Sequence, residues 1–270
     1  MKTHPVTSTV PDILARIVAK KRADLADARP LPIHAWERDA ERHLAATRRD
    51  FRAALTTRQT PAIIAEVKKA SPSKGLLSAN FDPARIAAEY ARGGAAALSV
   101  LTDAPFFQGS LADLAAARDA APVPVLRKDF TIDRVQILEA AAHGADAVLL
   151  IAAILGEREI REFREEAGRL RLAALVEVHN RRELDTAIAA GADLVGVNNR
   201  DLNTFEVTLE TSLELAPHMP KNAVLVSESG IHSAADIVRL RAAGYHAFLV
   251  GEHLMKSGDP AAALAQLVAA

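Results

Sequence analysis

The sequence predicts a (β/α)8 barrel, in which eight parallel strands alternate with eight helices. Three observations support this fold class. Four short apolar runs each follow an alanine-rich stretch and a glycine, and these glycines recur roughly every 50 residues. Four further apolar runs lie about half a period away from the first set. Stretches of helical length separate the runs, so the chain repeats a strand–helix unit often enough to close such a barrel.

The eight apolar runs have the length and continuity of strands that are buried on both faces. In chain order they are residues 62–65, 97–101, 123–126, 147–151, 172–176, 194–197, 223–226 and 247–250. The glycines that precede alternate runs are Gly94, Gly144, Gly191 and Gly244. Because glycine readily adopts the left-handed backbone that ends many helices, each is typical of a helix end followed by a strand.

The stretches between the runs carry helix signals. Asp82 and Pro83 stand where a capping residue and a first-turn proline open a helix. Ile160, Phe163 and Leu170 recur at nearly helical spacing. The alternative fold is an open, doubly wound sheet. Such a sheet usually has fewer strands, and no Gly-x-Gly-x-x-Gly turn follows the first strand here.

Residues 1–58 do not fit the repeat. They contain an apolar helical stripe and, from about Glu37 to Leu55, a polar stretch rich in arginine; the stripe is Ile13, Leu14, Ile17 and Val18. No linker separates this segment from Pro61. We expect a helical extension over residues 1–58 that packs on one end of a barrel of residues 59–270, all within one structural domain. A second interpretation is that the extension also shapes the mouth of the active site.

The composition excludes several classes of protein. The 33 Lys and Arg residues are balanced by 34 Asp and Glu residues, so there is no basic excess for binding nucleic acid. The absence of cysteine excludes disulfides, thiolate zinc sites and a cysteine nucleophile. The longest apolar run, residues 147–155, is far shorter than the roughly 20 residues of a membrane span. The nine histidines lack metal-binding spacing, so we expect no metal.

Ionisable side chains follow the odd-numbered strands. They are Glu66 and Lys68 after the first strand, Lys128 and Asp129 after the third, Glu177 after the fifth, and Glu228 with Ser229 after the seventh. A single charge at a strand end is often only a solvated terminus. Four sets in register are different, because barrel closure brings the carboxyl ends of all strands to one mouth. We therefore expect the active site there, with Glu66 and Lys68 both pointing into the barrel top.

Residues suited to an anionic ligand follow the sixth, seventh and eighth strands. Asn198 and Arg200 follow the sixth strand, Gly251 follows the eighth, and Gly230 follows Ser229 after the seventh. Small residues after strands seven and eight let backbone N–H groups approach a phosphate. The sequence therefore predicts a substrate that bears a phosphate.

Two further features point to the ligand. The first loop, residues 68–80, combines lysines with small residues such as Ser71, which suits a flap over an anion. Phe106 and Phe107 lie just beyond the second strand in a chain with few aromatic residues. Two interpretations are open: the adjacent rings pack within the loop, or they flank an aromatic substrate at the barrel mouth.

Several of these segments resemble the indole-3-glycerol phosphate synthase family, whose members close the indole ring in tryptophan biosynthesis. The most specific match is the segment from Ile64 to Gly75, which reads IAEVKKASPSKG. The resemblance covers essentially the whole chain and continues through residues 99–103, 107–110, 126–130, 176–177, 197–202, 226–231 and 251–255. It implies the same barrel that the periodicity predicts.

The resemblance implies a carbon–carbon lyase that needs no cofactor. The family's reaction closes a ring on a ketone, releases carbon dioxide and then loses water. By motif, Lys128 is the general acid at the ketone oxygen, and Glu177 is the general acid/base at the leaving hydroxyl. Glu66 and Lys68 match a pair that positions the substrate and shares in the dehydration.

The remaining roles implied by the resemblance concern binding. Asn198 and Ser229 match positions that orient the substrate, and Arg200 matches an anion contact. The backbones of Gly230 and Gly251, with Ser71 nearby, are expected to hold the phosphate. Some family members place a serine at position 252, where this chain has Glu252, so only the backbone is expected to act there.

Two other functions were weighed against this one. A phosphoribosylanthranilate isomerase-like barrel shares the phosphate site but uses a cysteine as base, and this chain has none. A catalytically silent sugar-phosphate-binding barrel is expected to lack Lys128 or Glu177, and both are present. We expect a phosphorylated small-molecule substrate with an aromatic carboxylate, no nucleic-acid partner and no membrane contact. We also expect no signal or transit peptide, a cytoplasmic location and a monomer.

Overall fold

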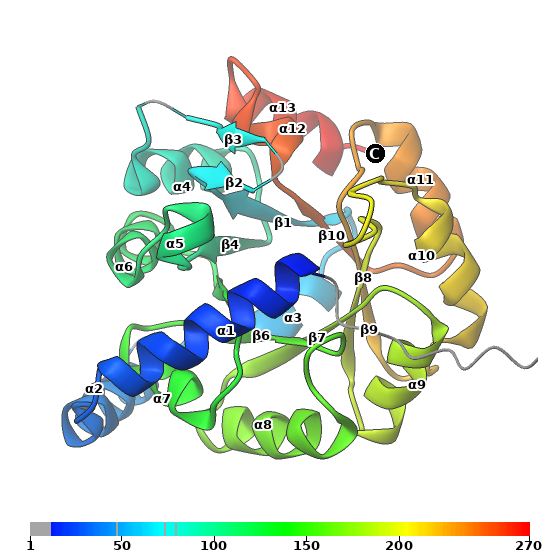
Figure 1. Ribbon diagram of the computed structural model, residues 1–270. Helices are drawn as coiled ribbons and strands as arrows, with labels where there is room; N and C mark the ends of the chain where they lie inside the picture. The colour runs from blue at the N-terminus through cyan, green and yellow to red at the C-terminus, as the bar shows by residue number, and fades with distance from the viewer. Residues whose placement is uncertain (1–11, 47, 73, 79) are drawn as a thin grey trace, which may run out of the picture.

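The computed structural model describes residues 12–270 apart from positions 47, 73 and 79. Eight parallel strands close a barrel in the order β1-β10-β9-β8-β7-β6-β5-β4 (Figure 1). The strands are β1 Ala62–Val67, β4 Ala97–Leu101, β5 Val125–Lys128, β6 Ala147–Ile151, β7 Ala173–Val178, β8 Leu194–Asn198, β9 Val224–Glu228 and β10 Ala247–Val250. The predicted (β/α)8 barrel is therefore confirmed. The first 11 residues of the predicted extension lie outside the described part of the chain.

Five strands extend further toward their carboxyl ends than the apolar pattern predicts. Four of them include an ionisable residue: Glu66 in β1, Lys128 in β5, Glu177 in β7 and Glu228 in β9. Backbone pairing does not depend on side-chain polarity, so the ladder continues past the last apolar residue. Ile151 is in register with Glu177, and Asn198 is in register with Glu228. These four ionisable residues are therefore held by strands rather than by loops.

One or two helices follow each barrel strand (Figure 1). They are α4 Pro83–Arg92, α5 Ala104–Phe107, α6 Leu111–Ala120, α7 Arg134–Ala142, α8 Glu157–Arg169, α9 Arg181–Ala189, α10 Glu210–Leu215, α11 Ala234–Ala242, α12 Glu252–Met255 and α13 Pro260–Val268. Asp82 caps α4 by accepting a hydrogen bond from the Arg85 backbone, as predicted. The four predicted helix-ending glycines all have positive φ. No helix in the described part of the chain is both long and apolar enough to cross a membrane.

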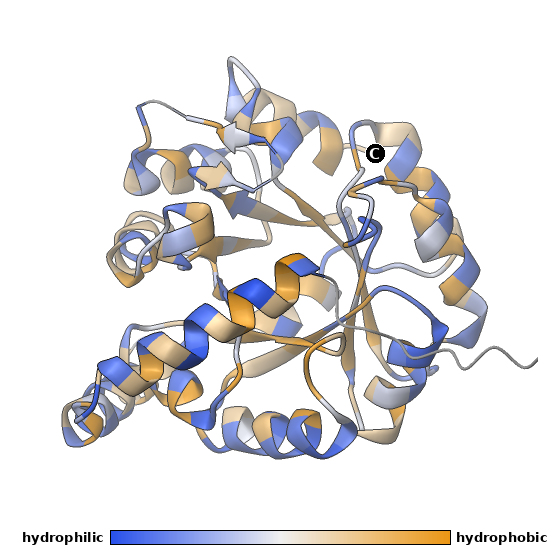
Figure 2. Cartoon of the chain, in the orientation of Figure 1, coloured by the Kyte–Doolittle hydropathy of each residue, from blue (hydrophilic) through white to orange (hydrophobic). Residues whose placement is uncertain are grey.

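Apolar side chains form two layers, one on each side of the barrel wall. Along β1, Ile63 and Val67 join the cluster between strands and helices, whereas Ala62 and Ile64 join the cluster inside the barrel. By the same alternation Glu66 faces the interior. Most barrel strands are hydrophobic along their length, while the surrounding helices mix hydrophobic and hydrophilic residues (Figure 2). The barrel interior is therefore mainly apolar, and its charged residues lie at the ends of the strands.

The N-terminal helices contact both ends of the barrel, which corrects the expectation of packing on one end. These helices are α1 Asp12–Asp27, α2 Ile33–Ala46 and α3 Phe51–Thr56. At the carboxyl ends of the strands, Lys21 of α1 pairs with Asp129 at 2.7 Å and with Asp103 at 3.1 Å. α2 packs on α7, and α3 contacts β1, β4 and β9. Both α1 and α3 bury apolar side chains in the interior cluster, because the barrel interior needs a cover at each end.

A buried carboxylate joins this extension to the barrel. Asp146 precedes β6 and is 1% exposed. Its Oδ2 accepts hydrogen bonds from Arg118 at 2.5 Å and from the Val125 backbone N–H at 3.0 Å. Its Oδ1 accepts one from the Arg49 backbone N–H at 2.9 Å. Asp146 therefore fixes the start of two strands and the segment that leads into α3.

We expect Asp146→Asn to lower the free energy of unfolding by about 3 kcal/mol, because Arg118 loses a buried counter-charge. Urea unfolding followed by circular dichroism measures the change. Glu41→Gln, at an exposed position on α2, is the control and should change stability by less than about 0.5 kcal/mol. If the Asp146 variant is no less stable than the control, the buried ion pair with Arg118 does not stabilise this part of the barrel.

Candidate active site

A cavity of about 370 Å³ opens at the carboxyl ends of the strands. Every barrel strand contributes to its lining, together with the loops that follow β1, β8 and β9. One wall is apolar and comes from α1, through Ile13, Leu14 and Ile17. The extension thus shapes the mouth. A cavity with an apolar wall and a few convergent charged groups is typical of a small-molecule site.

All eleven residues singled out as catalytic or binding candidates line this cavity. They are Glu66, Lys68, Ser71, Phe107, Lys128, Glu177, Asn198, Arg200, Ser229, Gly230 and Gly251. Phe106 is not among the lining residues. The rings of Phe106 and Phe107 both pack against the interior apolar cluster, but of the two only Phe107 lines the cavity. Phe107 lies against Phe130, with ring centroids 6.0 Å apart.

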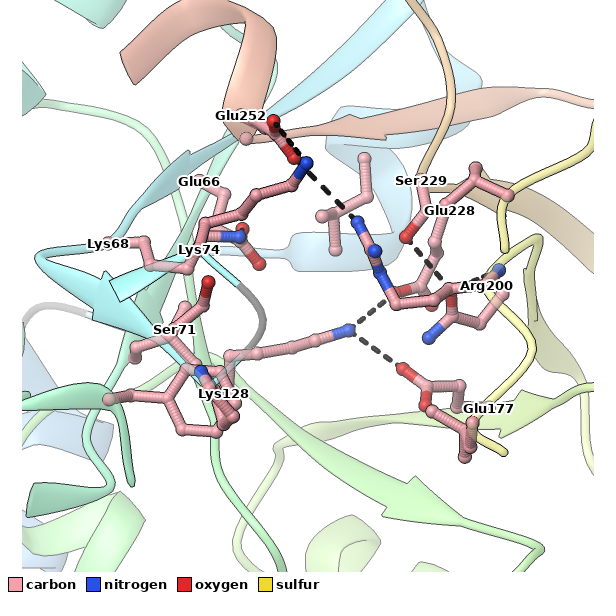
Figure 3. A pocket seen from close by; sticks show the side chains of 18 of the residues that line it. Glu66, Lys68, Ser71, Lys74, Lys128, Glu177, Arg200, Glu228, Ser229 and Glu252 are labelled. Atoms are coloured by element: carbon pink, nitrogen blue, oxygen red, sulfur yellow. Dashed lines mark hydrogen bonds and ion pairs between the residues drawn. The ribbon is translucent and has the colours of Figure 1, made fainter. Parts of the chain in front are cut away.

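Lys128 lies at the centre of the charged floor. Its Nζ donates to Glu177 Oε2 at 2.8 Å and also to Glu228 Oε2 (Figure 3). The Lys128 side chain is only 13% exposed. Burial alone would lower the pKa of Lys128, but the negative charges of the surrounding glutamates outweigh it and hold that pKa above its usual range. The ammonium group is therefore protonated at neutral pH.

The pKa values of the two carboxylates beside Lys128 are shifted in opposite directions. Burial tends to raise the pKa of Glu177, but Lys128 and His179 outweigh it and hold that pKa well below its usual range. Burial raises the pKa of Glu228 to about 7, and the nearby charge of Glu177 adds to that rise. Glu177 is thus ionised at neutral pH, whereas Glu228 can hold a proton. Two carboxylates sharing one site commonly separate in this way.

A second ion pair stands beside the first. Lys68 pairs with Glu66 across the end of β1, and both side chains line the cavity (Figure 3). Gly251 lies against the Glu66 carboxylate, and a side chain at that position would collide with it. Gly196 in β8 makes room for the Glu228 carboxylate in the same way. These two glycines let buried carboxylates pack against the strands.

Polar contacts orient the ends of β8 and β9. Asn198 Oδ1 accepts hydrogen bonds from Ser229 Oγ at 2.9 Å and from the Arg200 backbone N–H at 3.1 Å. Ser229 and Gly230 follow each other with φ of 69° and 77°. Two successive left-handed residues turn the chain sharply after β9, and this turn presents its backbone at the cavity rim. Asn199 does not line the cavity, but its Nδ2 donates a hydrogen bond to the Ser229 carbonyl oxygen at 3.1 Å.

Glu252 connects three cations at the rim. Its carboxylate lies 3.7 Å from Lys74 Nζ and 3.8 Å from Arg200 Nη2 (Figure 3). Lys256 Nζ lies 2.7 Å from the same carboxylate. Hydrogen bonding to Lys256 is the main cause that holds the pKa of Glu252 below its usual range. The side chain therefore holds the loops after β1 and β8 beside α12.

Sequence reasoning left three lining or adjacent residues without a role. Glu228 stood among the strand-end charges, but no motif singled it out. Lys74 was seen only as part of a basic loop, and its contact with Glu252 depends on how that loop folds. His179 received no role from the sequence. Its position two residues after Glu177 was the usable signal, because β7 continues to Val178 and alternate residues share a side.

The arrangement offers two chemical capacities. A protonated ammonium group can polarise a carbonyl oxygen, and the adjacent ionised and titrating carboxyl groups can move protons. The described residues contain no group of three or more His, Asp or Glu side chains placed to hold a metal ion.

Comparisons with known proteins show which proteins this chain resembles. The sequence profile of the family described as indole-3-glycerol phosphate synthase matches residues 14–267. A protein of that name from Burkholderia vietnamiensis is 52% identical over 260 residues, which are 95% of this chain and 98% of the relative. One from Koribacter versatilis is 54% identical over 235 residues, which are 86% of this chain and 89% of the relative.

Two solved structures share the fold. A 3-hexulose-6-phosphate synthase superposes with a TM-score of 0.59 at 18% identity, over 77% of this chain and 98% of its own. A thiamine phosphate pyrophosphorylase from Pyrococcus furiosus has a TM-score of 0.56 at 18% identity, over 77% of this chain and 93% of its own. At this identity the likeness extends to the barrel alone.

Proposed function

The chain belongs to the indole-3-glycerol phosphate synthase family, and we propose that the cavity described above carries out that family's reaction. The substrate is 1-(2-carboxyphenylamino)-1-deoxyribulose 5-phosphate. The products are indole-3-glycerol phosphate, carbon dioxide and water. The observation that carries the proposal is the position of Lys128, protonated and held between Glu177 and Glu228 in the floor of the cavity.

Binding uses the two sides of the cavity differently. The phosphate lies against the backbone N–H groups after β9 and β10, at Gly230 and Gly251, with Ser71 and Arg200 nearby. The aromatic ring lies toward Phe107 and the apolar wall of α1. Asn198 and Ser229, already joined by a hydrogen bond, orient the chain between the two ends.

Ring closure requires a proton donor at the ketone oxygen. The aromatic carbon that bears the carboxylate attacks the ketone carbon, and Lys128 donates its proton as the oxygen gains negative charge. The carbon–carboxylate bond then breaks, and its electron pair restores the aromatic ring as carbon dioxide leaves. Glu228, whose pKa is raised to about 7, stands beside Lys128 and can return a proton to it.

Dehydration completes the indole ring. The hydroxyl formed from the ketone leaves as water, and a proton is lost from the adjacent methylene carbon. Because Glu177 is ionised at neutral pH, it first accepts a proton from the substrate and then delivers one to the hydroxyl. Glu66 and Lys68 form the second ion pair at the same floor, where they position the substrate and share in this step. The cytoplasmic location and monomeric state expected from the sequence belong to the same proposal.

We expect Lys128→Ala to lower kcat by about 10³-fold or more while the fold survives, because the acid for ring closure is lost. Indole fluorescence, measured after addition of the carboxyphenylamino substrate, follows turnover, and circular dichroism checks folding. Lys221→Ala, at an exposed position before β9, is the matched control and should keep the rate of the unmodified protein. Substantial turnover by the Lys128 variant would show that another group supplies the acid.

We expect Glu177→Gln to bind substrate within about threefold of normal but to slow dehydration by about 10²-fold. Carbon dioxide release from carboxyl-labelled substrate should then run ahead of indole fluorescence in a single turnover, because the hydroxylated intermediate accumulates. Equal rates for the two signals, at undiminished turnover, would remove Glu177 from the dehydration step.

A further inference from the structure

His179 is a buried ionisable residue that the reaction described above does not use. It directly follows β7, two residues after Glu177. Its ring lies between two carboxylates, with Nε2 at 3.4 Å from Glu177 Oε1 and Nδ1 at 2.9 Å from Glu183 Oε2. The His179 side chain is 9% exposed. The ring therefore connects the active-site carboxylate to α9.

Glu183 is itself held in place by the first turn of α9. One of its oxygens accepts from Asn180 Nδ2 at 2.7 Å, and the other accepts from the His179 backbone N–H at 2.8 Å. Asn180 also caps α9, by accepting from the Glu183 backbone N–H at 3.0 Å. The carboxylate that faces Nδ1 therefore has a fixed position, so the ring between the two carboxylates is oriented from the helix side.

The geometry indicates the charge of the ring. A neutral imidazole has one N–H and one lone pair, so it would direct a lone pair at one of the two carboxylates. An imidazolium has an N–H on both nitrogens and avoids that repulsion: Nδ1 hydrogen-bonds Glu183, and Nε2 makes an ion-pair contact with Glu177 that is too loose for a hydrogen bond. Burial lowers the pKa of His179, but the contacts with Glu177 and Glu183 and their negative charges outweigh it and raise that pKa to about 10.

The two oxygens of Glu177 thus face two different cations. Oε1 faces His179, and Oε2 accepts from Lys128 at 2.8 Å. Contacts on both oxygens restrict rotation of the carboxylate. Without His179, the Glu177 carboxylate would be oriented by Lys128, which also pairs with Glu228, and by the neighbouring Glu228 carboxyl.

We propose that His179 is a positioning residue for Glu177: as an imidazolium anchored by Glu183, it fixes the orientation of the Glu177 carboxylate and keeps it ionised. This inference rests on the proposed function, in which ionised Glu177 moves the protons of dehydration. His179 itself touches no reacting atom in that scheme.

The proposal predicts a shift in pH dependence. The charged groups around Glu177 are Lys128 on β5, Glu228 on β9 and His179, with Glu183 on α9 behind the histidine. Removing a nearby positive charge raises the pKa of a carboxylate. Activity that needs ionised Glu177 is lost below its pKa, so the acid limb of the kcat profile moves to higher pH.

The kinetic test is His179→Gln, with His34→Gln as matched control because His34 pairs with Glu37 at an exposed site on α2. We expect kcat to fall roughly tenfold to a hundredfold in His179→Gln, with KM changed less than about threefold. We also expect its acid limb to rise by about one pH unit or more. Glu183→Gln should lower kcat less, and should have no further effect in the His179→Gln background. Unchanged kcat and an unchanged acid limb in a folded His179→Gln protein would overturn the proposal.

A second measurement does not depend on turnover or on the stability of a variant. Ring ¹⁵N chemical shifts of the unmodified protein, with His179 assigned by comparison with the variant or by selective labelling, report its protonation. At about pH 8, where a histidine of ordinary pKa is neutral, we expect His179 to remain an imidazolium. A neutral His179 at that pH would overturn the proposal even if the kinetic effects were present. Failure of the unmodified protein to form an indole product would instead contradict the proposed function, while the protonation measurement still tests His179.

Discussion

The buried contact of Lys128 with Glu177 and Glu228 is the interaction on which the rest of the site depends. Charges removed from water are stabilised only when their partners are placed with good geometry, and no single loop supplies that placement. Here Lys128 comes from β5, Glu177 from β7 and Glu228 from β9. Only closure of the barrel brings the ends of these strands to one point. The same interaction keeps the cation protonated and gives its two carboxylates different protonation at neutral pH.

The surrounding structure serves this cluster in two ways. Gly196 and Gly251 leave space for the carboxylates of Glu228 and Glu66, so that charged side chains pack where apolar ones would otherwise fill the barrel. The N-terminal helix α1 covers the mouth with an apolar wall, which limits water around the charges and strengthens their interactions. On the side of α9, His179 pairs with Glu177 and Glu183 pairs with His179, so positive and negative side chains alternate from the cavity toward this helix.

Much of the fold could be predicted from the sequence because parallel strands buried on both faces leave continuous apolar runs, and the helix-ending glycines mark their spacing. The site could be predicted in outline because the topology sends every strand end to one mouth. The carboxyl ends of the strands could not be predicted, because Glu177 and Glu228 pair with neighbouring strands although they are charged. The path of the extension and the contact between Glu252 and Lys74 could not be predicted either, because both depend on tertiary packing that leaves no local sequence pattern. Nor could the sequence show that Phe107 but not Phe106 lines the cavity, because adjacent residues on the short helix α5 point in different directions.

The central claim is that Lys128 gives its proton to the ketone oxygen. A crystal structure with an unreactive analogue, in which that ketone is reduced to an alcohol, tests this most directly. We expect Lys128 Nζ within about 3.2 Å of the alcohol oxygen, with the phosphate against the backbone of Gly230 and Gly251. If Lys68 occupied that place instead, with Lys128 still bound only to Glu177 and Glu228, Lys128 could not be the acid for ring closure.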